Sequence, residues 1–219
     1  MKSNEELQKD IIDAINWEPL LHAATIGVAV ENGVVTLTGA VNSFSKKAEA
    51  RQAAQDVSGV KTVIEKIDVV FDAKSQKTDN EIETEIINAF KWHWDIPNEN
   101  VNVKVASGLV TLSGQLEWNY QKEAAQKTVS NLIGVKGISN DIRIVSLSKD
   151  GIEKKDIEDA IIRNGHIDST SIEIEVINNL VTLRGSVDSW YQKSEAGRIA
   201  WNAPGVKQVQ NDLYVDFEE

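Results

Sequence analysis

The stretch Asn32-Gly33-Val34-Val35-Thr36-Leu37-Thr38-Gly39 recurs twice more along this chain, and it decides the fold. The other copies are Ser107-Gly108-Leu109-Val110-Thr111-Leu112-Ser113-Gly114 and Asn178-Asn179-Leu180-Val181-Thr182-Leu183-Arg184-Gly185. A Gly-Val step follows the last glycine of each copy by 20 residues, as Gly59-Val60, Gly134-Val135 and Gly205-Val206. The copies are spaced by 75 and then 71 residues, which is too long for a solenoid unit and suits a small domain. The sequence therefore predicts three homologous modules in tandem.

Each module begins with an apolar helical spacing and continues with a strand of alternating apolar residues. The first helix is predicted from Leu7, Ile11, Ala14 and Ile15, from Ile82, Ile86, Ala89 and Phe90, and from Ile157, Ile161 and Ile162. Asp79 and the segment Lys154-Lys155-Asp156 mark helix starts. The first strand is predicted from Ile26, Val28 and Val30, from Val101, Val103 and Val105, and from Ile172, Ile174 and Val176. The turn pairs at 32–33, 107–108 and 178–179 favour left-handed backbone, so this strand and the Val-Thr-Leu strand should form a hairpin.

A second helix rich in small residues follows each hairpin. Its buried face is predicted from Ala50, Ala53, Ala54 and Val57, from Ala125, Thr128, Val129 and Leu132, and from Ala196, Ile199, Ala200 and Ala203. Gly59, Gly134 and Gly205 are expected to form the C-terminal caps of these helices, and Gly39, Gly114 and Gly185 are also structural glycines. The third strand is predicted from Val63, Ile67 and Val69, from Ile138, Ile142 and Ile144, and from Val209, Leu213 and Val215.

The order of these elements predicts the architecture. A right-handed crossover through the second helix makes the second and third strands parallel. We therefore expect an α+β fold of three αββαβ modules, each a small three-stranded mixed sheet with two helices on one face. The modules should cover residues 3–72, 79–146 and 152–217, with short polar linkers at 72–78 and 146–151. The third module is four residues shorter between its first helix and first strand.

Composition excludes several classes of function. The net charge is −11, divided as −3 over residues 1–76, −2 over 77–148 and −6 over 149–219, so no repeat has the positive field on which general nucleic-acid binding rests. The absence of cysteine excludes disulfides and thiolate chemistry. The N-terminus lacks the apolar core of a signal peptide, and no apolar run approaches the length of a membrane span. The sequence predicts a cytoplasmic protein with no transmembrane segment, or a periplasmic one if a leader is missing from this chain.

Catalytic and cofactor motifs are lacking. His22, His93 and His166 occupy non-equivalent places in the modules and have no partner at ligand spacing, so they are expected to be structural or solvated. The sequence has no phosphate-binding glycine loop, nucleophile elbow or helical metal motif. Acidic runs such as Glu81, Glu83 and Glu85 suit a solvated helix start. We expect that the protein is not an enzyme and that it has no cofactor and no metal site.

The repeated residues resemble those of a known family. The glycine after Val-Thr-Leu, the alanine-rich second helix and the Gly-Val before the third strand resemble BON domains, named after bacterial osmotically inducible and nodulation-related proteins. The segment from Glu117 to Ala125 and that from Trp190 to Val206 are similar to bacterial proteins with three BON domains and no signal peptide. The resemblance implies a non-enzymatic αββαβ module linked to envelope and osmotic stress, which associates with phospholipid or with other proteins, and most family members known for this are periplasmic.

The second helix of module three carries an unusual aromatic stripe. Trp190, Lys193, Gly197 and Trp201 share one side of this helix, away from the face marked by Ala196. The equivalent positions in the other modules are mostly polar, so only module three should have this surface. The stripe is predicted to be either an interface with another module or a site for a partner protein or lipid headgroup.

Aromatic residues next to lysines mark the starts of the second helices. Phe44, Lys46 and Lys47, then Tyr120 and Lys122, then Tyr191 and Lys193 could place a ring and an ammonium group at a headgroup boundary. Trp118 falls on the buried face and is interpreted as a core residue. Trp17 and Trp92 at the ends of the first helices, extended by Phe90 and Trp94, are expected to be core rings.

These patterns together predict a non-catalytic, stress-associated binding protein. A protein-interaction scaffold is favoured by the stripe and by the threefold repetition. The alternative is a phospholipid-binding module, favoured by the aromatic residues next to lysines. The net negative charge of the protein counts against binding to an anionic lipid surface. Nucleic acid is disfavoured as a partner, both by charge and because the copies lack the Gly-x-x-Gly loop of a KH domain.

Overall fold

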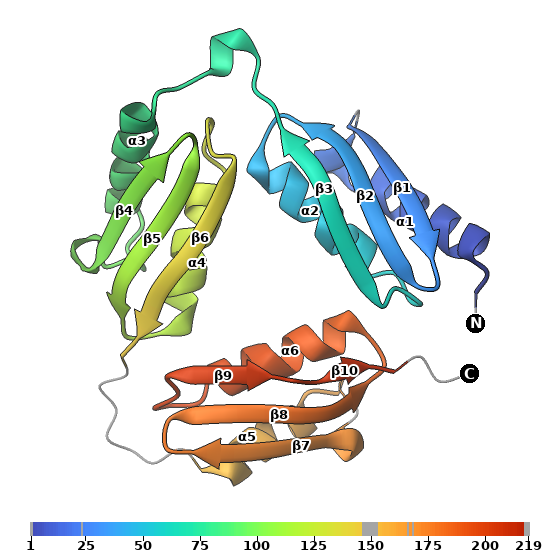
Figure 1. Ribbon diagram of the computed structural model, residues 1–219. Coiled ribbons are helices and arrows are strands. Elements are labelled where there is room, and N and C mark those ends of the chain that lie inside the picture. Colours follow the sequence, from blue (N-terminus) through green and yellow to red (C-terminus); the bar gives the residue numbers. More distant parts are fainter. Residues whose placement is uncertain (1, 23, 146–152, 166, 168, 217–219) are drawn as a thin grey trace. The chain divides into compact units, whose positions relative to one another are not determined.

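The computed structural model describes residues 2–22, 24–145, 153–165, 167 and 169–216. Within these residues the chain forms three αββαβ modules, each with its own sheet (Figure 1). Module 1 contains α1 (Asn4–Trp17), β1 (Thr25–Glu31), β2 (Val34–Val41), α2 (Phe44–Gln55) and β3 (Thr62–Val69). Module 2 contains α3 (Asp79–Trp92), β4 (Val101–Ala106), β5 (Leu109–Leu116), α4 (Asn119–Ser130) and β6 (Gly137–Ile144). Module 3 contains α5 (Lys154–Arg163), β7 (Ile172–Ile177), β8 (Leu180–Val187), α6 (Trp190–Trp201), β9 (Gln208–Asn211) and β10 (Tyr214–Val215).

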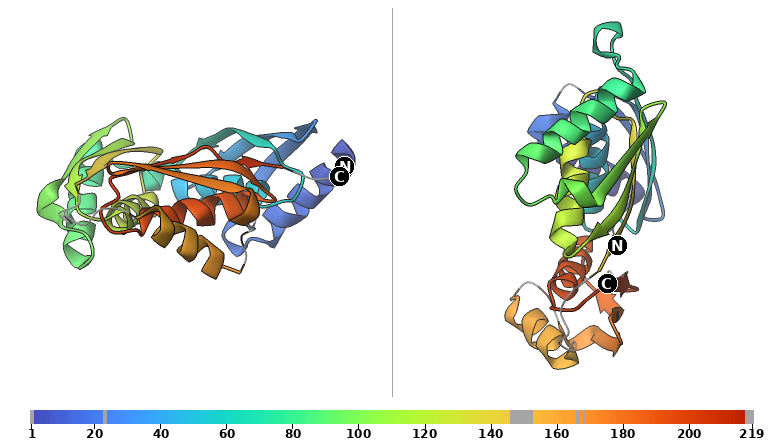
Figure 2. Two further views of the ribbon diagram at one scale, coloured as in Figure 1. Left: turned by 90° about the horizontal axis from the view of Figure 1, so that it is seen from below. Right: turned by 90° about the vertical axis from the view of Figure 1, so that its left-hand side faces the viewer.

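The second strand of each module lies in the middle of its sheet. In module 1, β2 pairs antiparallel with β1 and parallel with β3, with Leu37 opposite Val28 on one side and Glu65 on the other. Module 3 repeats this arrangement around β8, and module 2 has the strand order β4-β5-β6. Both helices of a module cover the same face of its sheet (Figure 2). The predicted α+β class and the mixed sheet are confirmed.

The third strand of module 3 is divided. Asp212 and Leu213 interrupt it, so β9 and β10 each pair with β8 as separate short strands. The buried Leu213 side chain takes the place that Ile67 and Ile142 hold in the continuous strands β3 and β6.

The predicted apolar faces supply the cores. Module 1 buries Leu7, Ile11, Ile15, Val35, Leu37, Ala50, Ala54 and Ile67. Module 2 buries Ile82, Ile86, Phe90, Val110, Leu112, Ala125, Val129 and Ile142. Module 3 buries Ile157, Ile161, Ile174, Val181, Leu183, Ala196, Ile199 and Ala200. One position of the predicted helix stripe is wrong, because the Ile162 side chain is 62% exposed.

Left-handed backbone occurs in the hairpin turns and in the turns before the third strands. Asn32, Ser107 and Asn178 have φ of 53°, 54° and 56°, as the hairpin turns require. The prediction that Gly59, Gly134 and Gly205 cap the second helices is wrong. Helix α2 ends at Gln55 and α6 at Trp201, so Gly59 and Gly205 lie four residues further on, in the turn before the third strand. There a side chain on Gly59 or Gly134 would meet Leu7 or Ile82 of the first helix.

The first helices of modules 1 and 2 begin with reciprocal caps. Ser3 and Thr78 each accept a hydrogen bond from the N–H of the third helical residue, Glu6 or Glu81, whose carboxylate accepts from the cap residue in return. These hydrogen bonds lower the pKa of both glutamates below the ordinary value. Helix α5 has Glu153 as its N-cap, with no side-chain hydrogen bond.

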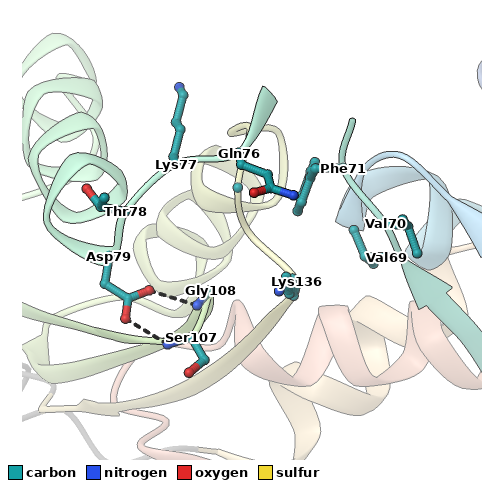
Figure 3. Close-up of a pocket in the computed structure, with 11 residues that line it drawn as sticks. Val69, Val70, Phe71, Gln76, Lys77, Thr78, Asp79, Ser107, Gly108 and Lys136 are labelled. Atoms are coloured by element: carbon teal, nitrogen blue, oxygen red, sulfur yellow. Dashed lines mark hydrogen bonds between the residues drawn. The ribbon is translucent and has the colours of Figure 1, made fainter. Parts of the chain in front are cut away.

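The start of α3 also holds the hairpin turn of module 2. The Asp79 carboxylate accepts hydrogen bonds from the N–H groups of Ser107 and Gly108 at 2.8 and 2.9 Å, as Figure 3 shows. In module 1 the Asn4 side chain accepts one such bond from Asn32. The turns of modules 1 and 2 are therefore fixed to the helices that begin those modules.

The linker predicted at 146–151 and the predicted module ends at 146, 152 and 217 lie outside the described residues, as does His166.

Candidate functional site

The most exposed aromatic side chains lie where the first helices of modules 1 and 2 end. Trp17 is the last residue of α1 and Trp92 the last of α3, and these side chains are 86% and 89% exposed. Trp94, two residues past the end of α3, is 92% exposed. The prediction that the three rings belong to the core is wrong, and only Phe90 is buried. We call Trp17 with Leu20, and Trp92 with Trp94, the helix-one tips.

The helical period explains this exposure. Trp17 follows Leu7 by ten residues, which turns it about 80° to one side of Leu7 on a helix of 3.6 residues per turn. Ile11 and Ile15 lie on the other side of Leu7, toward the sheet. Trp92 has the same relation to Ile82. Spacing along the helix could thus have revealed the tips, whereas hydrophobicity alone assigned them to the core.

Each tip is anchored by a buried residue a few positions further on. After Trp17 the chain forms a short 3₁₀ turn (Pro19–Leu21), and Leu21 enters the core of module 1. Ile96 is buried at the equivalent place in module 2. Charged groups differ between the tips: Asp13 and Glu18 flank Trp17, whereas Lys91 and His93 flank Trp92, and His93 Nδ1 lies 3.5 Å from Asp95 Oδ1.

The predicted helix-two lysines are bound to their own modules. Lys47 Nζ donates to the Ile67 carbonyl at 2.8 Å and pairs with Glu65 at 2.8 Å. Lys122 Nζ donates to the equivalent carbonyl of Ile142 at 2.8 Å, and burial lowers the pKa of Lys122. These contacts hold the second helix against the third strand. They turn two of the ammonium groups predicted for headgroup contact toward the protein.

In module 3 the second helix is joined to the third strand by an asparagine of the strand. Asn211 Nδ2 donates to the backbone carbonyl of Lys193 at 2.7 Å, as Asn140 does to that of Lys122. Lys193 Nζ instead lies 5.2 Å from the centroid of the Trp190 ring, a cation–π contact.

The aromatic stripe of α6 partly faces its own module. Gly197 is buried, and a Cβ there would meet Asn211 of β9. Trp201 is half-buried and packs on the core of module 3. Trp190 is also half-buried. The structure thus brings the four stripe residues together on one side of α6, with Gly197 and Trp201 committed to intramodular packing.

The remaining predicted site residues are more dispersed. Tyr120 and Tyr191 are exposed at the starts of α4 and α6, as their spacing predicted. Phe44, Lys46 and Trp118 are half-buried. Trp118 immediately precedes α4 and is not among the fully buried core residues.

In the parts of the chain that the structure describes, no group of three His, Cys, Asp or Glu side chains could hold a metal ion. No helix among the same residues is long and apolar enough to cross a bilayer.

The chain is a tandem of three αββαβ modules, and exposed tryptophans end the first helices of two of them. The BON domain model matches residues 3–70, 78–146 and 149–216, and the chain belongs to the BON-domain family.

Two bacterial proteins are similar to this chain in sequence. It is 29% identical over 188 residues to the osmotically-inducible protein Y of Escherichia coli (strain K12), covering 82% of this chain and 92% of that protein. It is 32% identical over 146 residues to an uncharacterized protein in the gshII 5' region of Anaplasma centrale, covering 63% of this chain and 92% of that protein. Among solved structures, the C-terminal domain of CdsD from the type III secretion system of Chlamydia trachomatis is similar with a TM-score of 0.25 and 15% identity, over 98% of this chain and 100% of that one.

Proposed function

We propose that this chain is a non-catalytic binding protein of the osmotic stress response, a protein-interaction scaffold whose contact surface is formed by the helix-one tips. The observation that carries this proposal is the near-complete exposure of Trp17, Trp92 and Trp94. Tryptophan buries a large apolar area on contact and is enriched among the residues that dominate binding energy. Three such rings at equivalent helix ends of two modules form a repeated contact element.

Charge indicates the chemistry of the partner. Residues 1–76 and 77–148 have net charges of −3 and −2, and Asp13 and Glu18 flank the Trp17 tip. A partner that accepts the Trp17 ring in an apolar pocket with a basic rim would complement both features.

The experiment compares capture by the full chain and by tip variants. The tagged chain serves as bait in lysates of the source bacterium grown at high osmolarity. The triple variant Trp17→Ala, Trp92→Ala, Trp94→Ala should lose roughly 30-fold in capture, since interface hot spots contribute about 2 kcal/mol or more. A control variant, Tyr120→Ala with Tyr191→Ala, removes two exposed aromatics elsewhere and should retain the partner. Equal capture by the triple variant and the parent would contradict the proposal.

Contact with phospholipid is the second candidate, and the module 2 tip favours it. Lys91 directly precedes Trp92 and lies three residues before Trp94, so aromatic rings and an ammonium group lie close together in sequence there. Flotation with phosphatidylglycerol and phosphatidylcholine vesicles tests this function. Binding should be weak, confined to the anionic vesicles and lost as salt rises, because local cations oppose a net charge of −11. Flotation that depends on Trp92 and Trp94 would assign the tips to lipid and overturn the scaffold.

A further inference from the structure

The free edge of strand β7 differs from its counterpart in module 1. β7 lies at the edge of the module 3 sheet, and among the described residues it pairs only with β8 (Figure 1). Its hairpin closes with Ile177 opposite Leu180, so alternation along the strand directs the backbone N–H and C=O groups of Ile172, Ile174 and Val176 outward. Module 1 shows the same parity, because Val28, the counterpart of Ile174, accepts a hydrogen bond at its edge carbonyl from Gln8 Nε2 at 2.7 Å.

Module 3 lacks this protection. Glu158 follows Ile157 as Gln8 follows Leu7, but an ionised carboxylate has no N–H to donate. The Glu158 carboxylate is paired instead with Lys154 Nζ at 3.3 Å. Among the described residues no side chain donates to the carbonyl of Ile174, so the edge is open to an incoming strand.

A cavity lies beside this open edge. Helix α5 has 10 residues where α1 and α3 have 14, so its last turn, which in module 1 carries Ile15, is absent. The space left between α5 and β7 is about 160 Å³ and is lined by Glu158, Ile161, Ile162, Ser169, Ile172 and Ile174. The exposed Ile162 side chain lies on its wall, which makes the cavity suited to an apolar side chain from outside the module.

We infer that the β7 edge is a strand-addition site for an extended segment of a partner protein in which apolar and basic residues alternate. In the partner segment, the residues that hydrogen-bond to Ile172, Ile174 and Val176 would place their side chains on the helix side of the sheet, toward the cavity. These partner residues should be apolar. The alternate residues face the other side, beside the exposed Glu173 and Glu175, and these should be basic. A second copy of this chain would bring glutamates against glutamates, which disfavours self-pairing.

Designed peptides test backbone pairing directly. The probe is the capped peptide (Val-Lys)₄, added to the full chain, with protection read by hydrogen exchange and mass spectrometry. Residues 172–177 should be protected, whereas residues 25–31, whose edge Gln8 covers, should not. The same peptide with N-methylvaline should lose binding, because the valine N–H groups point to β7. With N-methyllysine it should retain binding, and (Val-Glu)₄ should not bind.

Matched variants of the chain test the role of position 158. Glu158→Gln gives module 3 the edge donor of module 1 and should weaken (Val-Lys)₄ binding by about three- to tenfold, the equivalent of one net hydrogen bond. Glu83→Gln, the same change in module 2, should leave binding at β7 unaltered. Absence of protection at 172–177, equal binding of the N-methylvaline peptide, or equal protection at 25–31 would overturn the inference. Protection at 172–177 that grows with protein concentration without peptide would assign the edge to a second copy and also overturn it.

Discussion

A glycine two residues before the end of each Val-Thr-Leu strand is required by its neighbour across the hairpin. Gly39, Gly114 and Gly185 have φ of 133°, 135° and 112°, a backbone conformation that residues with a side chain adopt only with strain. A Cβ at each would overlap the backbone carbonyl of Thr25, Asn100 or Ser171, at the start of the first strand or just before it. The repeat predicted that these glycines are structural. The reason why glycine is required lies in the pairing of the two strands, which brings a carbonyl of one against the Cα of the other.

Substitution in module 2 measures this constraint. Gly114→Ala should lower the free energy of unfolding by about 1–3 kcal/mol from backbone strain alone, with the carbonyl overlap adding to it. Gly137→Ala is the matched control, since its φ is not in the left-handed region and its new Cβ would meet only the exposed side chain of Leu109. Urea melts of both variants would show the difference. An equal loss in the two variants would mean that any glycine substitution in this sheet is equally costly.

Single residues also mark the limit of sequence reasoning at the candidate site. The sequence pattern shows the positive charge of Lys47 and Lys122 beside aromatic residues, but not how far these side chains reach. Their long side chains extend to carbonyls of the third strand, 20 residues away in sequence. Such long-range hydrogen bonds depend on how the crossover places the helix, which periodicity does not describe.

Among the elements, the first helix differs between modules. Helices α1 and α3 have the same length and reciprocal caps, whereas α5 is one turn shorter and starts without a side-chain cap. The four-residue difference was readable from the sequence, but its consequence, an open cavity beside β7, was not. That consequence depends on which turn of the helix covers the strand.

A cap supplied to α5 should stabilise module 3. Glu153→Thr provides a hydroxyl that can accept the N–H of Asp156, as Thr78 accepts that of Glu81. We expect a gain of about 0.5–1 kcal/mol in the free energy of unfolding of module 3. The converse variant Thr78→Ala should destabilise module 2 by a similar amount. Thermal or urea unfolding followed by hydrogen exchange assigns each change to its module, and no gain in Glu153→Thr would show that the start of α5 is constrained by something other than its cap.

At the scale of the whole molecule, the three modules share a fold but not their surfaces. Buried positions repeat closely, because each module must fill the same space between two helices and a sheet. Exposed positions diverge: the tryptophan tips occur in modules 1 and 2, and the cavity beside β7 occurs in module 3. The repeat therefore predicted the cores well, whereas binding surfaces needed the exposure of each side chain.

The tips should be accessible in the intact chain, and tryptophan fluorescence measures this. Three of the six tryptophans are nearly fully exposed and Trp118, Trp190 and Trp201 are half-buried, so acrylamide should quench a large fraction of the emission readily. The variant Trp17→Phe, Trp92→Phe, Trp94→Phe should lose this accessible fraction while its free energy of unfolding changes by no more than about 0.5 kcal/mol, as for surface substitutions. Trp201→Ala, in contrast, should destabilise the chain by about 1–3 kcal/mol, because that ring packs on the core of module 3. Weak quenching of the parent protein that strengthens on dilution would mean that the tips are covered by a second copy, and a strongly destabilised triple variant would place them in a core.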